Sequence, residues 1–189
     1  RPGAWSALVG GTTSALAFGS TTAFLPVFVR ERGLERFSPF FAAYVGAALL
    51  VRLLGGGLGD RLGYRRVAGV ALVVFAAAVA AFPLVWSTPV LVGLALVYGT
   101  AHGLVYPSLN ALFVAGVPES SRGRAMALFT LSFNVGVTTS AFAGGELAER
   151  LGFEALWLTM AALSLLGVIA LVRDDAHRSS PSSRSAFRA

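Results

Sequence analysis

The chain has 189 residues, of which 56% are hydrophobic and only 13% charged, and its mean hydropathy is +0.73. Soluble domains carry about 25% charged residues, so this composition excludes an ordinary soluble domain and predicts a membrane protein. The net charge of +6 comes from arginines that lie mostly in polar connections, which is typical of membrane orientation rather than of nucleic-acid binding. The absence of cysteine excludes disulfides and thiolate metal sites.

Apolar runs separated by short polar segments predict six membrane-spanning helices, each close to the roughly 20 residues that a bilayer core requires. No charged residue occurs between Arg66 and Glu119, a stretch too long for one crossing, and Pro83 and Pro89 divide it into two helices. Residues 173–189 are polar and rich in serine and arginine, so we expect a disordered tail there. The predicted spans cover residues 4–29, 38–58, 67–86, 89–114, 125–145 and 153–172.

The distribution of arginine predicts the orientation of these spans. Six crossings place both ends of the chain on one side, and ten arginines lie in the segments on that side. Only four lie in the opposite segments, namely Arg30, Arg32, Arg36 and Arg150. Positively charged loops stay inside the cell. We therefore expect an integral protein of the plasma (inner) membrane with both ends of this chain in the cytoplasm. Because the sequence begins with arginine rather than methionine, we also expect a longer native protein.

Two polar turns resemble each other and indicate an internal repeat. Residues 57–65 read GLGDRLGYR, and residues 146–154, three spans later, read ELAERLGFE. An acidic residue and an Arg-Leu-Gly run recur at matching positions, with Asp60 corresponding to Glu149. Chance similarity between two glycine-containing turns is the alternative. A repeat of three spans must be inverted across the membrane, as in secondary transporters. The predicted fold is therefore an all-α integral membrane protein with six transmembrane helices in two inverted three-helix repeats.

Residues 56–66, GGLGDRLGYRR, resemble the cytoplasmic loop signature G-x-L-A-D-R-x-G-R-R of the major facilitator superfamily (MFS), with departures at Gly59 and Tyr64. Residues 103–113 and 118–129 resemble the matching helices and loop of that family's C-terminal half. The resemblance implies one six-helix half of a twelve-span permease or efflux transporter, and we favour the C-terminal half. It implies secondary active transport of a small solute by alternating access, without a cofactor. The expected partners are the lipid bilayer, the other six-helix half and a small-molecule substrate, with or without a coupling ion, and no nucleic acid.

The loop signature and its surroundings supply the candidate gating residues. The resemblance implies that Asp60 docks at the start of the fifth helix, near Arg122 and Arg124, and braces the state closed to the cytoplasm. The alternative is that the acid and the arginines only cap helices and mark topology. Arg52, the one basic residue inside a span, is expected to snorkel, to pair with Asp60 or to contact substrate. The full set is Arg52, Gly56, Asp60, Arg61, Gly63, Arg65, Arg66, Arg122 and Arg124.

Polar and aromatic side chains recur at helical spacing in the first, fourth and fifth spans. Unpaired polar groups are costly in lipid, so these faces should look into the bundle or a water-filled cavity. The family resemblance implies that the first and fourth spans line a central cavity, whereas hydrogen bonding between helices is the alternative for each residue. His102 would be either a proton-coupling residue or a neutral hydrogen-bonding one. The candidates are Ser14, Phe18, Thr21, Tyr98, His102, Tyr106, Asn110, Thr130, Asn134 and Thr138.

Two other classes of protein can be compared with the transporter. An intramembrane enzyme would require a G-x-S-x-G or H-E-x-x-H motif or paired carboxylates inside spans, and the sequence has none of these, so neither an enzyme nor a metal site is expected. A phosphate-binding glycine loop is disfavoured because no strand surrounds residues 55–63. The remaining alternative is a stand-alone six-span scaffold or channel that acts as a dimer. A native reading frame that continues upstream into six more spans would exclude it.

Overall fold

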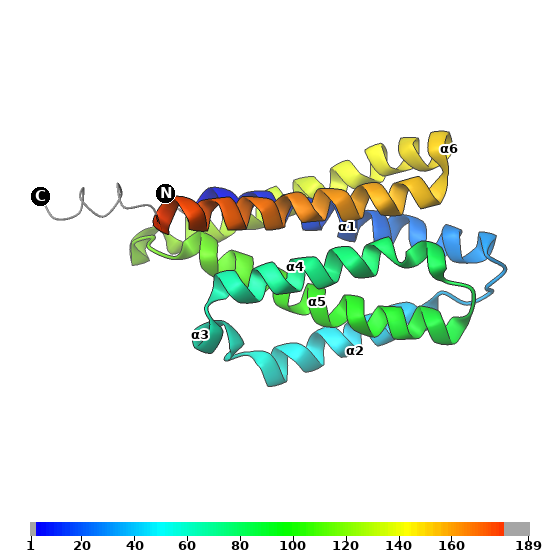
Figure 1. Ribbon diagram of the computed structural model, residues 1–189, viewed down its shortest axis with the longest axis horizontal. Coiled ribbons are helices and arrows are strands. Elements are labelled where there is room, and N and C mark those ends of the chain that lie inside the picture. Colours follow the sequence, from blue (N-terminus) through cyan, green and yellow to red (C-terminus); the bar gives the residue numbers. More distant parts are fainter. Residues whose placement is uncertain (1–2, 180–189) are drawn as a thin grey trace, which may run out of the picture.

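The computed structural model describes residues 3–179 and contains only helices over that range. Helix α6 contains Gly152 at φ 83° and ψ 167°, a backbone conformation that essentially only glycine adopts. The chain turns back there, so α6 consists of two arms, 119–151 and 153–179 (Figure 1). The elements are α1 (Ala4–Glu31), α2 (Ser38–Gly55), α3 (Leu58–Leu62), α4 (Tyr64–Ala80), the 3₁₀ turn η1 (Phe82–Leu84), α5 (Thr88–Val114) and α6 (Glu119–Ser179).

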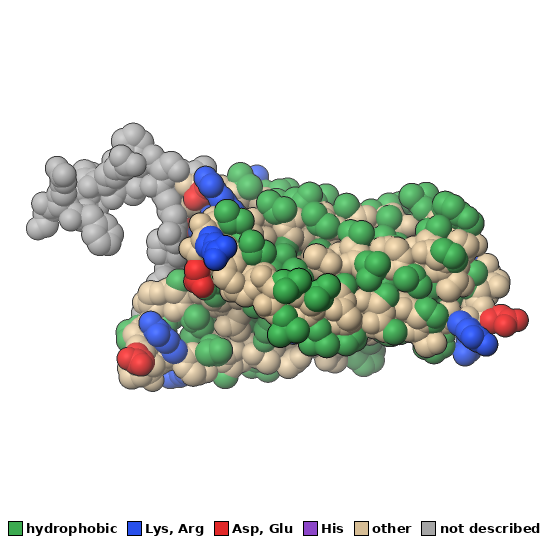
Figure 2. Space-filling view, turned by 90° about the horizontal axis from the view of Figure 1, so that it is seen from below, with side chains coloured by type: hydrophobic (Ala, Val, Ile, Leu, Met, Phe, Trp, Pro, Cys, Tyr) green, Lys and Arg blue, Asp and Glu red, His purple; other side chains and the backbone are tan. Residues whose placement is uncertain are grey.

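Four of the described helices, α1, α2, α5 and α6, are long and apolar enough to cross a membrane by length and composition. Helix α4 has 17 residues, slightly fewer than the roughly 20 that a bilayer core takes. The predicted all-helical membrane fold is therefore confirmed, whereas the number of six spanning helices is not. Figure 2 shows charged side chains at the two ends of the visible face and none between them. A band without charge between two charged rims suits a protein embedded in a bilayer.

Several predicted boundaries need correction. Helix α2 ends at Gly55 rather than at residue 58, because two further glycines follow before α3 begins. The third helix covers Tyr64–Ala80 rather than 67–86, and Pro83, which lacks an N–H, lies in the 3₁₀ turn that follows. Helix α6 continues to Ser179, so the prediction of disorder is wrong for residues 173–179. Residues 180–189 lie outside the described residues.

Small residues set how closely the helices pack. Helix α1 packs mainly on α6 and α2 mainly on α5, while α4 covers both α5 and α6. A methyl group added to Gly103 of α5 would lie 2.7 Å from Val51 Cγ1 and 3.0 Å from Ala48 Cα of α2. On α6, a methyl group at Gly136 would lie 2.8 Å from Ala15 Cβ of α1. Glycines with this spacing let helix backbones approach closely within a membrane.

The turns of the bundle lie at two ends, which fixes where each loop sits. Helix α3 lies at the same end as the start of α1 and the end of α6 (Figure 1). The turn at Gly152 lies at the opposite end. The core between the two ends is aromatic, with Phe75, Tyr98 and Trp157 almost completely buried. The polar groups of the middle of the bundle are therefore enclosed by rings.

Candidate functional site

His102 lies near the middle of α5 and is the centre of a polar group inside the bundle. Its side chain is only 5% exposed. Phe18 of α1 stacks on the imidazole with ring centroids 4.4 Å apart and planes within 7°. Tyr44 of α2 places its Oη 3.1 Å from His102 Nδ1, and Phe133 of α6 lies at a centroid distance of 6.3 Å. Side chains of three helices, α1, α2 and α6, therefore converge on one imidazole of α5.

The two ring nitrogens of His102 differ in their hydrogen bonding. Nδ1 faces Tyr44 Oη, whereas Nε2 is buried and has no protein partner among the described residues. When Tyr44 donates its hydroxyl proton to Nδ1, the neutral ring carries its own proton on Nε2. A buried polar atom without a partner costs about 1–3 kcal/mol. Nε2 is therefore a point where a bound solute or a water would gain a hydrogen bond.

Four predicted cavity residues, His102 among them, come together inside the bundle rather than on an open wall. Tyr98 lies one helical turn before His102 and is 1% exposed, with its ring 4.9 Å from that of Phe75. Within the described part of the chain, the Tyr98 Oη has no hydrogen bond of normal geometry. The side chain of Thr21 is the polar group that interacts with it. Thr21 Oγ1 donates to the Ala17 carbonyl at 2.8 Å. Phe18 completes the group.

The other predicted cavity residues form a more open region. Tyr106 Oη and Thr130 Oγ1 are 3.0 Å apart and join α5 to α6. Further along α6, Asn134 and Thr138 are exposed. Asn110 is half-buried on α5. Ser14, by contrast, is fully buried on α1 and donates to the Gly11 carbonyl at 3.0 Å. The predicted set therefore divides into a buried centre and an exposed strip beside it.

Three residues that surround His102 were not predicted from the sequence, namely Tyr44, Phe75 and Phe133. For Tyr44 a signal existed, because Tyr44, Ala48 and Arg52 recur at intervals of four and form one stripe along α2. Phe75 lies within a long apolar run where nothing distinguishes it from other core residues, and Phe133 stands between Ser132 and Asn134 without a pattern that marks it.

Arg52 is exposed near the end of α2, and its side chain makes a contact that was not among the sequence expectations. Its Nε donates to the backbone carbonyl of Gly103 at 3.2 Å. Four residues further along α5 is Pro107, which lacks the N–H that would normally pair with this carbonyl. Arg52 therefore supplies the hydrogen bond that proline removes. No ion pair joins Arg52 to Asp60 within the described residues, and the Asp60 carboxylate accepts a hydrogen bond from Tyr64 Oη at 2.6 Å.

The expected docking of Asp60 on the fifth helix is not observed. Within residues 3–179 no ion pair joins Asp60 to Arg122 or Arg124. The reason lies in the packing: α3 rests on α4, whereas α6 packs mainly on α1. Arg122 Nε instead donates to the Val117 carbonyl at 3.3 Å, and Arg124 lines a separate groove of 350 Å³.

The remaining loop candidates have simpler surroundings. Gly56 follows the end of α2, and Gly63 separates α3 from α4 with φ 86°. Arg61 is exposed. Arg66 is also exposed and lines an apolar groove of 670 Å³ between α3, α4 and α5. None of the predicted cavity residues lines that groove.

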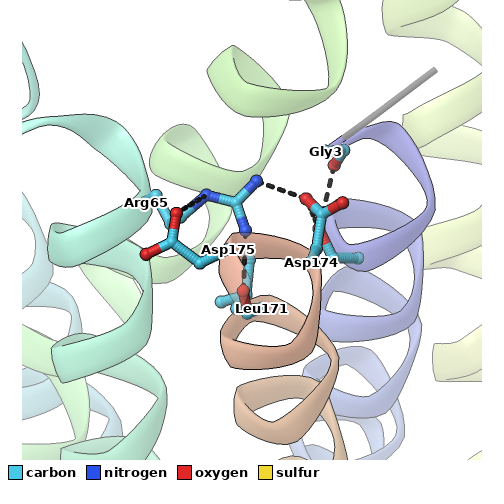
Figure 3. Close-up of polar contacts among 6 residues, drawn as sticks. Gly3, Arg65, Leu171, Asp174 and Asp175 are labelled. Atoms are coloured by element: carbon cyan, nitrogen blue, oxygen red, sulfur yellow. Dashed lines mark hydrogen bonds and ion pairs between the residues drawn. The ribbon is translucent and has the colours of Figure 1, made fainter. Parts of the chain in front are cut away.

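Arg65 joins three helices at the α3 end of the molecule (Figure 3). It forms an ion pair with Asp174, lies 3.9 Å from Asp175, and donates to the Leu171 carbonyl at 2.7 Å. Ser6 of α1 donates to Asp174 at 3.2 Å. Asp174 lies beyond the predicted sixth span. Burial acts to raise the pKa of Asp174, but the hydrogen bond and charge of Arg65, with the bonds from α1, outweigh it and lower that pKa.

Long apolar helices, a charge-free band and a buried polar centre define a helical integral membrane protein. Its sequence matches the Major Facilitator Superfamily over residues 7–188, and the chain belongs to that family. The family that the glycine-rich loop predicted by its resemblance is thus confirmed.

Similar proteins are named as transporters. An uncharacterized MFS-type transporter of Pseudomonas aeruginosa (strain LESB58) is 30% identical over 167 residues, which cover 86% of this chain and 40% of the relative. An uncharacterized MFS-type transporter of Burkholderia mallei (strain SAVP1) is 27% identical over 168 residues, covering 85% of this chain and 39% of the relative. The chain therefore spans about 40% of the length of these curated relatives.

Proposed function

We propose that this chain is one six-helix half of a twelve-span secondary transporter that moves a small solute by alternating access. Membership of the family and the names of the relatives support transport as the activity. The other partners would be a second six-helix half and a substrate, with or without a coupling ion. That this chain is the C-terminal half stays a prediction from its sequence.

The observation that carries the proposal is the position of the two similar turns. The turn containing Asp60 and the turn containing Glu149 lie at opposite ends of the molecule (Figure 1). On this basis α1, α2 and α4 form one triplet, and α5 with the two arms of α6 forms the other. Two triplets whose equivalent turns face opposite sides are related by inversion, as in secondary transporters.

The packing of helices supports the same relation. The first helix of one triplet, α5, crosses the second helix of the other, α2, through Gly99 and Gly103. The equivalent pair is α1 and the first arm of α6, which cross through Gly19 and Gly136. Both equivalent pairs of helices therefore cross closely at small residues.

The surroundings of His102 supply the proposed solute path. The exposed strip with Thr130, Asn134 and Thr138 is the face on which we place the central cavity and the second half. The arginine bias supports placing the α3 end, with both ends of this chain, in the cytoplasm and the protein in the inner membrane.

Labelling of introduced cysteines tests both inversion and alternating access, since this chain has no cysteine of its own. The complete protein, with any other cysteine replaced by serine, is labelled with a membrane-impermeant maleimide from each side. We expect Asp60→Cys to react only from the cytoplasm, Glu149→Cys only from outside, and Asn134→Cys from either side. The buried control Ala68→Cys should react from neither.

Labelling of Asp60→Cys and Glu149→Cys from the same side would disprove the inverted repeat. Labelling of Asn134→Cys from one side alone, under all substrate conditions, would disprove alternating access. A reading frame limited to these spans would favour the dimeric scaffold or channel instead.

A further inference from the structure

The side chain of Arg52 lies on the face of α2 that meets other helices. Tyr44, Ala48 and Arg52 share one stripe of α2, and a methyl group at Gly103 of α5 would meet Ala48 at 3.0 Å. The same stripe reaches α1, because the rings of Tyr44 and Phe18 are 6.1 Å apart. The exposed leucines of α2 occupy the other faces, at positions 49, 50, 53 and 54. Arg52 is itself exposed, but its Nε reaches the Gly103 carbonyl, so the guanidinium lies at the edge where α2 meets α5.

The guanidinium is anchored by backbone instead of by an acid. Nε is fixed on the Gly103 carbonyl, which Pro107 leaves without its helical partner. The described residues provide no carboxylate ion pair for Arg52. Its recorded hydrogen bond uses only Nε, so the two Nη groups remain for a ligand. A cation that no acid compensates is costly within a membrane span and marks a functional site.

His102 adds a second donor next to this cation. His102 directly precedes Gly103, whose carbonyl anchors Arg52. The positive charge of Arg52 interacts electrostatically with both His102 and Tyr44. Its Nε2 is buried and without a protein partner, as described above. Phe18 and Phe133 flank the imidazole with apolar rings.

We propose that Arg52 and His102 bind the anionic group of the transported solute, and that Phe18 and Phe133 hold its apolar part. The solute class is then an organic anion, such as an aromatic carboxylate. Guanidinium groups bind carboxylates through two parallel hydrogen bonds. The only Asp or Glu within the predicted spans is Glu154, at the start of the sixth span, and it forms an ion pair with Arg32. This inference rests on the proposed transport function.

Three probes of nearly equal shape and different charge test the inference: benzoate, benzyl alcohol and benzylamine. Binding of each radiolabelled probe is measured on the complete protein in phosphatidylcholine vesicles. We expect benzoate to bind at least about tenfold more tightly than the other two, as loss of a hydrogen-bonded charge usually implies. Arg52→Gln should reduce benzoate binding to the level of benzyl alcohol, while Arg52→Lys retains part of the preference.

Arg173→Gln is the matched control, because it removes an exposed arginine at the α3 end, and it should leave benzoate binding unchanged. Equal binding of the three probes, tighter binding of benzylamine, or an unchanged preference in Arg52→Gln would overturn the inference. So would displacement of benzoate by added phosphatidylglycerol, since Arg52 would then serve a lipid headgroup.

The two proposals can fail separately. If Asn134→Cys still reacts from both sides but benzoate has no advantage, only the anion assignment is wrong. If Asn134→Cys reacts from one side alone, the transport proposal is wrong as well. The same labelling in Arg52→Gln shows whether that variant keeps the native fold, and Arg52→Lys provides the charge-preserving comparison.

Discussion

The crossing of α2 and α5 gives a sharp prediction for Gly99→Ala. A methyl group at Gly99 would collide with the backbone carbonyl oxygen of Tyr44 and lie 3.0 Å from Tyr44 Cα and 3.1 Å from Ala47 Cβ. The carbonyl belongs to the backbone of α2 and cannot rotate away, so the two helices must separate. Overpacking of this kind costs about 1–3 kcal/mol, while alanine gains about 0.8–1.0 kcal/mol over glycine in a helix. We expect a net loss of up to about 2 kcal/mol.

The same helix contains its own control. Gly93 of α5 has no atom within 4 Å of an added methyl group, so Gly93→Ala should gain helix propensity without a clash. We expect it to stabilise the protein by about 0.5–1 kcal/mol. Unfolding of both variants by sodium dodecyl sulfate in mixed micelles, followed by circular dichroism, measures the two free energies side by side. The two substitutions are chemically identical, so opposite signs would isolate the crossing.

The prediction is refuted if Gly99→Ala is as stable as Gly93→Ala. The backbones of α2 and α5 would then be farther apart than this arrangement requires. The placement of Tyr44 beside His102 would lose its support at the same time, because Tyr44 lies directly at the crossing.

Three further predictions concern other parts of the chain. Arg65 lowers the pKa of Asp174 below its ordinary value of 3.8. Their pairing therefore stabilises the protein fully above pH 3.8, and this stabilisation is lost as the pH falls through the lowered pKa. Asp174→Asn should flatten this part of a pH–stability curve. Gly152→Ala should cost about 1–3 kcal/mol in chemical unfolding, because its backbone conformation is essentially restricted to glycine. Tyr44→Phe should cost about 1–3 kcal/mol by leaving the ring nitrogen of His102 unpaired, and a loss within ±0.5 kcal/mol, typical of surface sites, would contradict that bond.

Much of the fold could be predicted because its cause is local in sequence. Residues 56–66 combine glycines, an acid and three arginines between apolar runs, and this composition identifies a loop between membrane helices without reference to distant contacts. The same residues resemble the MFS loop signature, and the family was confirmed. The break within the long uncharged stretch was also predictable, because proline ends a helix by its own chemistry.

Features that depend on the approach of distant helices were less predictable. The end of the third helix was placed six residues late, at Trp86 rather than Ala80, because apolar residues continue beyond the point where the helix stops. Docking of Asp60 on the fifth helix was expected from resemblance, yet α3 packs on α4 and a neighbouring tyrosine takes the hydrogen bond. Spacing along one helix carries no information about which neighbouring helix supplies the partner.

Arg52 and Pro107 show why such a partner matters. Each is unfavourable alone in a membrane span, since one carries a charge and the other leaves a carbonyl unpaired. Together they satisfy each other through the Gly103 carbonyl, and the charge is retained because a neutral carbonyl does not cancel it. A carboxylate partner would have anchored the guanidinium equally well but would have removed its attraction for an anion. An arginine fixed by backbone is thus both tolerated in the span and available to a negatively charged solute.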